Sequence, residues 1–200
     1  MLDMSTIEPY INAMTSIQKE LKQNKPFTSK TTEAAVALLR TADLVRRNLA
    51  AVIEPHDITV QQYNVLRILR GAGEKGLPTL DIAERMIEST PGITRLIDRL
   101  ESKHLVSRQR CKTDRRQVFC LITPQGLDLL GAIDEPLGAA GEMALSALRK
   151  RDVDDLLALL DRARDGLHAS IVSQRALNDA SKSRRASAGA QHRSRSQENS

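Results

Sequence analysis

The chain has 200 residues, of which 40% are hydrophobic and 2% aromatic, so we expect an aliphatic core built from packed helices. The absence of Trp and the presence of only two Tyr and two Phe exclude sites that need an aromatic cage or a platform for stacked bases. The net charge of +5 comes mainly from residues 181–200, which hold five Lys or Arg against one Glu, so the rest of the chain is nearly neutral.

Cysteine usage and hydropathy indicate the cellular compartment of the protein. The two cysteines, Cys111 and Cys120, do not make a disulfide framework. The N-terminus lacks a basic leader followed by a long apolar run, and no apolar segment reaches the roughly 18 residues that a membrane span needs. We therefore expect a soluble, cytoplasmic protein that does not contact a membrane.

Two helices are predicted after a weakly patterned N-terminal extension, residues 1–28. The first is expected to begin at Ser29, whose hydroxyl can cap the first turn, and to end before the next proline. Its apolar residues recur at spacings of three and four, which marks one buried face. The second helix is expected to be capped by Thr59 and to end at Gly71 or Gly73.

A pair of shorter helices follows. Leu77-Pro78 predicts a short extended segment, after which Thr79 is expected to cap a helix in TLDIAERMIE. A turn then leads into a helix predicted over residues 89–102. Its expected buried stripe is Ile93, Leu96, Ile97 and Leu100, whereas Thr94, Arg95, Asp98 and Arg99 point away from that stripe.

The hydrophobic period then changes from helical to alternating. LVSRQR and QVFCLIT alternate on either side of the polar turn CKTD, which predicts an antiparallel β-hairpin. Thr123-Pro124 is a helix start signal, a hydroxyl cap followed by proline at the first helical position. That helix is expected to be bent or interrupted near Glu135-Pro136, since an interior proline cannot donate a backbone hydrogen bond.

The outer helices predict a dimer. A last helix is expected over residues 152–172, followed by a disordered basic tail, residues 173–200, which has almost no apolar side chains. Together with the helices predicted over 29–53 and 124–148, the last helix is more apolar than a lone small domain needs. We therefore expect two copies to intertwine these helices as a homodimer.

Positive charge is concentrated in residues 95–116, which hold eight Lys or Arg against three Asp or Glu. Such a patch attracts phosphate backbones, although charge alone is equally typical of a solvated face. The order of helix, turn, helix and hairpin favours DNA, because it places the second helix in the major groove and leaves the hairpin as a wing. The predicted fold class is mainly α: a winged helix-turn-helix with a small β-hairpin wing and flanking dimerisation helices.

The predicted DNA contacts lie on the second helix of this pair and on the wing. The helix should begin with small polar residues so that its free amides can approach the groove. Arg95 is the expected guanine contact because its guanidinium matches O6 and N7. The predicted DNA-binding residues are Ser89, Thr90, Gly92, Thr94, Arg95, Arg99, Arg110, Lys112, Arg115 and Arg116.

Residues 29–172 resemble the winged-helix transcription factors of the MarR (multiple antibiotic resistance regulator) family. The motifs that carry the resemblance are ITVQQYNVLRIL at 58–69, LPTLDIAERM at 77–86, ITRLIDRLE at 93–101 and DRRQVFCLITPQG at 114–126. The resemblance implies an obligate homodimer, a palindromic operator in double-stranded DNA, and relief of repression by a small molecule or by oxidation.

The resemblance also implies roles for residues of the wing. By position, Arg116 should enter the minor groove and Asp114 should brace the wing turn. Arg115 should contact the DNA backbone or pair with an acid such as Asp98.

The chain departs from the family pattern at three places. His104 stands where the family often has glycine, at a position that favours left-handed backbone. Gly92 stands where Ser or Thr is frequent, and Cys111-Lys112 replaces a common Asp-Pro at the wing tip. These departures concern the operator sequence rather than the class of protein.

The first hypothesis is a homodimeric repressor of a palindromic operator, relieved by a small-molecule effector that binds between the dimer helices and the winged domain. The same fold could instead be a protein-interaction module for an acidic partner, or a redox-responsive regulator that uses Cys111, beside Arg110 and Lys112.

Cys120 is expected to be a small buried hydrophobe. The basic tail is either a solvated extension or a source of sequence-independent phosphate attraction. No enzymatic activity, cofactor or metal is expected, since the chain has no P-loop or catalytic triad pattern, and its histidines, His56, His104, His168 and His192, lack metal-ligand spacing.

Overall fold

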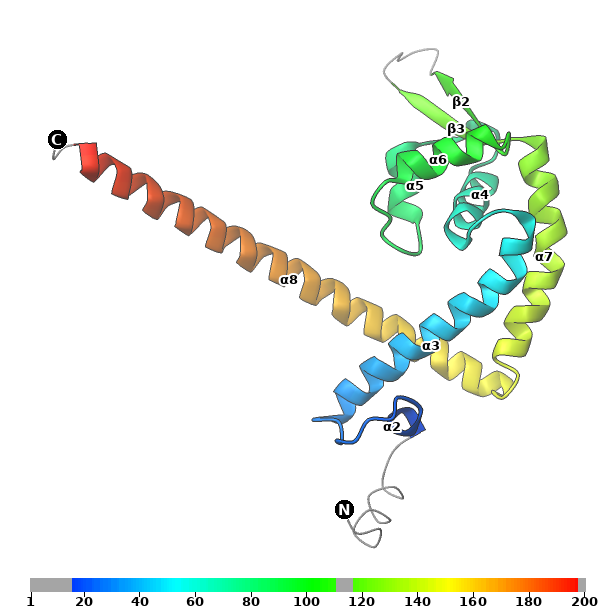
Figure 1. Ribbon diagram of the computed structural model, residues 1–200, viewed down its shortest axis with the longest axis horizontal. Coiled ribbons are helices and arrows are strands. Elements are labelled where there is room, and N and C mark those ends of the chain that lie inside the picture. The colour runs from blue at the N-terminus through cyan, green and yellow to red at the C-terminus, as the bar shows by residue number, and fades with distance from the viewer. Residues whose placement is uncertain (1–15, 111–116, 198–200) are drawn as a thin grey trace, which may run out of the picture. The chain divides into compact units, whose positions relative to one another are not determined.

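The computed structural model describes residues 16–110 and 117–197, and the side chains of 117–174 within the second range. The chain divides into two units, Met1–Ala144 and Leu145–Ser200, which are described separately below (Figure 1). The described residues of the second unit, 145–197, contain one helix, α8 (Lys150–Gln197).

The first unit is mainly helical, with a small sheet at one end (Figure 1). Its elements in chain order are α2 (Ser16–Glu20), α3 (Lys30–Ile53), η1 (Glu54–His56), α4 (Val60–Ala72), η2 (Gly73–Lys75), β1 (Leu77–Pro78), α5 (Thr79–Arg85), α6 (Ile93–Ser102), β2 (Val106–Arg110), β3 (Val118–Ile122) and α7 (Pro124–Ala144). The predicted class, a mainly α winged helix-turn-helix, is confirmed.

Three of the predicted helix starts are confirmed by their caps. The Thr32 amide donates to Ser29 Oγ over 3.0 Å at the start of α3. At α4 the Gln62 amide donates to Thr59 Oγ1 and the Thr59 amide donates to Gln62 Oε1, which together form a capping box. At α7 the Gly126 amide donates to Thr123 Oγ1 over 3.0 Å.

The sheet has three antiparallel strands in the order β1-β3-β2. The hairpin of β2 and β3 was predicted, whereas the pairing of β1 with β3 was not. Cys120 lies in the centre of the sheet, opposite Leu77 on one side and Arg108 on the other. Its side chain is fully buried, which confirms the prediction that it is a small buried hydrophobe.

The core of the first unit is centred on α4. Val65, Leu66 and Leu69 of that helix are 0% exposed, and they contact buried residues of α3, α5, α6, the sheet and α7. α7 also packs beside α3 (Figure 1), where Asn48 Nδ2 donates to the backbone oxygen of Ala140 over 3.0 Å. This core holds the helix pair α5–α6 and the sheet against the two long helices.

Two predicted helix starts were wrong, that of α5 by one residue and that of α6 by four. α5 begins at Thr79 with Pro78 as its N-cap and has no side-chain cap, because the pairing of β1 with β3 fixes Leu77 and Pro78 in an extended conformation. α6 begins at Ile93 rather than near residue 89. A residue that precedes proline, here Thr90, is disfavoured in helical conformation, and Gly92 has a positive φ of 96°.

The long helices also differ from their predicted extents. α7 continues through Pro136 without interruption. α8 continues from Lys150 to Gln197 and so includes most of the segment that we predicted to be disordered. Ala, Arg, Lys and Gln are good helix formers, so the scarcity of apolar residues there argues against a packed core but not against a helix. The domain boundaries at residues 28 and 172 stay predictions.

Both units carry exposed aliphatic side chains. In the first unit Leu38 and Leu39 of α3 are 43% and 71% exposed, and in α8 Leu157 and Leu159 are 55% and 58% exposed. Within the residues that the structure describes, no helix combines the length and apolar character needed to cross a membrane.

Candidate nucleic-acid interface

α6 presents one buried side and one exposed side. Leu96, Ile97 and Leu100 are buried in the core, as the apolar spacing predicted. On the opposite side, Thr94, Arg95 and Arg99 are exposed, and the spacing of four between the two arginines places them one above the other. We call these three residues the recognition face. The structure therefore brings three of the predicted DNA-binding residues together.

The segment before α6 holds three more of the predicted residues. Ser89, Thr90 and Gly92 precede the helix rather than form its first turn. Thr90 Oγ1 donates to the backbone oxygen of Glu88 over 3.0 Å, and the hydroxyl does not cap the helix. Gly92 is the N-cap, in a left-handed conformation that glycine adopts without strain.

The start of α6 therefore differs chemically from the capped helices. α3, α4 and α7 begin with a hydroxyl that accepts a hydrogen bond from a first-turn amide, whereas no side chain caps α6. The first amides of a helix carry partial positive charge and bind an anion when no side chain accepts from them. The first turn of α6, beside the recognition face, is thus suited to a phosphate.

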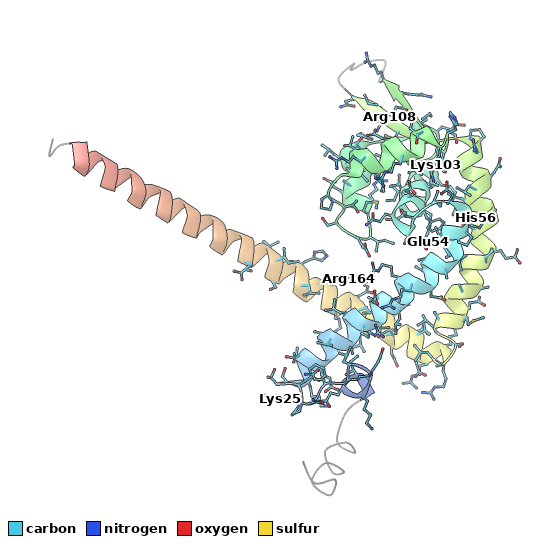
Figure 2. The ribbon with its side chains drawn as sticks, in the orientation of Figure 1. Lys25, Glu54, His56, Lys103, Arg108 and Arg164 are labelled. Carbon is cyan, nitrogen blue, oxygen red and sulfur yellow. The ribbon has the colours of Figure 1, made fainter. Side chains whose placement is uncertain are left out.

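The basic residues of segment 95–110 fall into two groups. Lys103 Nζ donates to the backbone oxygen and to the carboxylate of Asp57, and Arg108 pairs with two acids of α6. Lys103 and Arg108 are labelled in Figure 2. Arg95, Arg99 and Arg110 are exposed and form no ion pair within the described part of the chain. Among the described residues, the unpaired charges of the positive patch that the sequence suggested lie on the recognition face and at the end of β2.

Arg108 is the functional candidate that sequence reasoning missed. Its Nη2 donates to Asp98 Oδ1 over 2.6 Å and its Nη1 donates to Glu101 Oε2 over 2.5 Å. Partial burial opposes its charge, but the hydrogen bond that Arg108 donates to Asp98 and the charges of Glu101 and Asp98 outweigh that effect and raise the pKa of the guanidinium. The signal in the sequence was an arginine in the first wing strand after two acids three residues apart.

Part of the predicted wing lies outside the described residues. Cys111, Lys112, Asp114, Arg115 and Arg116 belong to that segment, so their roles stay predictions. Arg110, the last residue of β2, is described and exposed. The predicted pairing partner of Arg115, Asp98, is bound to Arg108.

The connection between α6 and β2 is fixed by backbone contacts. His104 has a positive φ of 58°, the left-handed conformation expected where the family often has glycine. Thr123 Oγ1 donates to the backbone oxygen of His104 over 2.7 Å, and the Thr123 amide donates to that of Leu105 over 3.1 Å. The exit of α6 and the entry to α7 are therefore held together.

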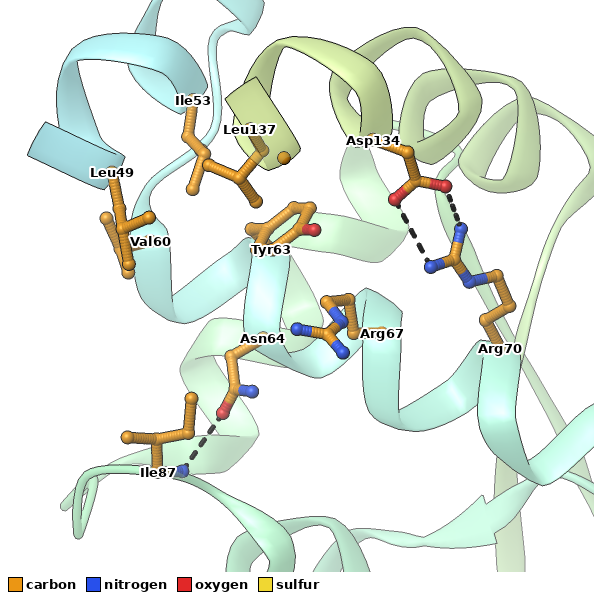
Figure 3. A pocket seen from close by; sticks show the side chains of 11 residues that line it. Leu49, Ile53, Val60, Tyr63, Asn64, Arg67, Arg70, Ile87, Asp134 and Leu137 are labelled. Carbon is orange, nitrogen blue, oxygen red and sulfur yellow. Dashed lines mark hydrogen bonds and ion pairs between the residues drawn. The ribbon is translucent and has the colours of Figure 1, made fainter. Parts of the chain in front are cut away.

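A cavity of about 390 Å³ lies among α3, α4 and α7 (Figure 3). Its lining residues are Leu49, Ile53, Val60, Tyr63, Asn64, Arg67, Arg70, Ile87, Asp134, Leu137 and Gly138. Arg70 donates two hydrogen bonds to the Asp134 carboxylate, which raises the pKa of the arginine. The cavity lies next to the helices predicted to flank an effector site.

The polar groups of the cavity come mainly from α4. The guanidinium carbon of Arg67 lies 6.0 Å from the centroid of the Tyr63 ring, and burial raises the pKa of the Tyr63 phenol. Asn64 Oδ1 accepts a hydrogen bond from the Ile87 amide over 3.1 Å, drawn as a dashed line in Figure 3. Ile87 follows α5, so this bond joins the cavity wall to the segment that leads into α6.

The described residues contain no group of three or more His, Cys, Asp or Glu that could hold a metal ion.

Comparison with known proteins identifies the family. The family model described as MarR family matches residues 58–118. The HTH-type transcriptional regulator TtmR of Methylorubrum extorquens (strain PA1) is 30% identical over 154 residues, which are 77% of this chain and 76% of that protein. The crystal structure of a MarR transcription factor from Planctomyces limnophilus is 38% identical, covers 68% of this chain and 98% of its own, and has a TM-score of 0.53.

A further solved structure supports the fold. A mutant MarR from E. coli, crystallised in complex with operator DNA, covers 70% of this chain and 99% of its own, with 22% identity and a TM-score of 0.62. With the fold, the helix pair α5–α6 and these alignments in agreement, the chain belongs to the MarR family of helix-turn-helix transcriptional regulators.

Proposed function

We propose that the protein is a cytoplasmic, homodimeric repressor that binds a palindromic operator and is released from it by a small-molecule effector. Each subunit places the recognition face of α6 in the major groove and its wing in the adjoining minor groove. The observation that carries the proposal is the exposed pair Arg95 and Arg99, without acidic partners in the described chain, beside an uncapped helix start. Arginine in the major groove contacts guanine, and an uncapped helix start binds phosphate.

The dimer is supported by the exposed aliphatic side chains of the outer helices. Leucines of α3 and α8 stay exposed in one subunit, and contiguous apolar surface is a feature of protein interfaces. A dimer presents two copies of α6 to half-sites about 34–36 Å apart. A small change in the spacing of the two helices therefore releases the DNA.

The effector site is supported by the cavity beside α4. Its aliphatic lining, with Leu49, Ile53 and Val60, suits the apolar body of a small ligand. Arg67 forms no ion pair with another described residue, so it offers a charge to a polar group of the ligand. The hydrogen bond between Asn64 Oδ1 and the Ile87 amide connects the cavity to the segment before α6. A ligand in the cavity can therefore affect that segment.

Selection of bound duplexes from a random pool tests the proposed function. We expect the recovered sequences to share a palindrome, because two identical subunits read two half-sites in opposite orientation. Recovery of a single asymmetric site would contradict the symmetric dimer. Absence of salt-dependent binding to any duplex would favour the protein-interaction module instead.

Arg116→Ala is expected to weaken binding to the selected duplex strongly, because the variant loses the arginine proposed to enter the minor groove. The dimer should stay intact, since the substitution lies in the wing segment. A gel-shift titration measures the affinity, and sedimentation measures the oligomeric state. Arg162→Ala removes the same charge from α8 and serves as the control, with little change expected. Equal affinity for the Arg116 variant and the unmodified protein would refute the role assigned to the wing arginine.

A further inference from the structure

We propose that Arg108 is a positioning residue that fixes the wing relative to the recognition helix α6, and so determines where the wing meets the DNA. The inference rests on the proposed function, because it concerns the same interface. Arg108 itself need not touch the operator. Its role is to make the helix and the wing bind as one rigid unit.

The first argument is the geometry of the two ion pairs. One guanidinium spans Asp98 and Glu101, with N···O distances of 2.6 and 2.5 Å. The two acids are three residues apart, so they lie on neighbouring positions of the helix surface. A planar guanidinium that holds two carboxylates at once defines both a distance and an orientation, which a lysine does not.

The second argument is the place of Arg108 in the sheet. Its backbone lies opposite Cys120 of β3, and Cys120 in turn lies opposite Leu77 of β1. The Cys120 side chain is 0% exposed, so this part of β2 is anchored on the core. Two residues after Arg108 the strand ends at Arg110 and the chain enters the wing segment. A contact at Arg108 therefore ties the end of β2, from which the wing segment follows, to α6.

The third argument is partial burial. The Arg108 side chain is 25% exposed, less than Asp98 at 52% and Glu101 at 40%. Ion pairs between fully exposed side chains contribute little, whereas a partly buried arginine with two hydrogen-bonded acids is held in one conformation. The side chain is therefore directed at α6 rather than available to a phosphate.

A purely electrostatic role makes a different prediction. Asp98 and Glu101 lie on the same helix as Arg95 and Arg99, and unpaired carboxylates there would repel the DNA backbone. If neutralisation were the only role of Arg108, removal of both acids would strengthen binding. If positioning is the role, removal of both acids breaks the contact between α6 and β2 and weakens specific binding.

The experiment compares three variants on the selected operator duplex. Arg108→Gln is expected to lower the affinity about tenfold, the loss typical of one well-placed contact, and Arg108→Lys to restore only part of it. The double variant Asp98→Ala with Glu101→Ala should also lose affinity. In a hydroxyl-radical footprint both Arg108→Gln and the double variant should lose protection of the minor groove beside each half-site, while protection of the half-site itself remains.

Arg40→Gln is the matched control. Arg40 also contacts two acids, Glu20 and Asp43, with a side chain 31% exposed, but it lies in α3. Its affinity for the duplex should stay within about twofold of the unmodified protein. Thermal unfolding of every variant identifies any that fail to fold. If Arg108→Gln fails to fold, the affinity and footprint of Arg108→Lys, which keeps the charge, test the inference instead.

Each outcome decides the inference. Tighter binding by the double variant, or retained minor-groove protection in Arg108→Gln, would overturn the positioning role. If Arg116→Ala weakens binding while the Arg108 variants do not, the proposed function stands and this inference fails. If no duplex is selected at all, the proposed function fails and the inference fails with it.

Discussion

Gly76→Ala is expected to lower the free energy of unfolding by about 3 kcal/mol or more. Gly76 has φ 61° and ψ −172°, a region almost restricted to glycine that costs other residues about 1–3 kcal/mol. A Cβ at this position would also lie 2.5 Å from the Cys120 backbone oxygen and 2.9 Å from Leu121 Cγ. The backbone oxygen belongs to the central strand β3, so the clash can be relieved only by displacing the sheet. Denaturant unfolding of the purified protein measures the loss.

Gly71→Ala is the matched control for this substitution. Gly71 lies inside α4, and a Cβ there would meet nothing within 4 Å. Replacing glycine by alanine in a helix interior gains about 0.5–1 kcal/mol. Because Gly71 is the second-last residue of α4, the gain should be smaller, and this variant should be at least as stable as the unmodified protein. Equal stability of the Gly76 and Gly71 variants would show that the approach of η2 to β3 is not as close as described.

Arg95→Ala is expected to reduce affinity for the selected operator by about 1–3 kcal/mol, which is roughly 5- to 150-fold. Arg95 lies in the first turn of α6, exposed and without an ion pair in the described chain. Loss of a bidentate contact to guanine should also relax the preference at one base pair of each half-site. Competition titrations with duplexes that differ at single positions measure both effects.

A comparison of Arg99→Ala with Arg95→Ala distinguishes a contact to phosphate from a contact to a base. Arg99 lies one turn further along the recognition face, and a contact to phosphate weakens binding to all sequences alike and lowers the salt dependence by about one ion per subunit. Arg95→Ala should therefore change the sequence preference, whereas Arg99→Ala should change only the overall affinity. The same uniform loss in both variants would refute the assignment of Arg95 to a base.

Local signals explain what the sequence could predict. Ser29, Thr59 and Thr123 cap their helices as expected, because capping depends on a side chain and amides two or three residues away. The change of hydrophobic period located the hairpin for the same reason. The buried stripe of α6 was correct for Leu96, Ile97 and Leu100, since it follows from spacing alone, whereas Ile93 is only partly buried.

Contacts between distant segments explain what the sequence could not predict. The pairing of β1 with β3 joins residues about forty positions apart, and it moved the start of α5. Arg115 was the expected candidate to pair with Asp98, and the structure gives Arg108 as its partner, because strand direction and helix orientation decide which arginine faces the acids. The start of α6 depended on the positive φ of Gly92, which sequence spacing does not determine.

The glycine cap of α6 has a thermodynamic consequence. A capping side chain satisfies one of the first amides of a helix within the protein itself, whereas no described side chain accepts from the first amides of α6. DNA that supplies acceptors for those amides stabilises the first turn, so ordering of this turn and binding are linked equilibria.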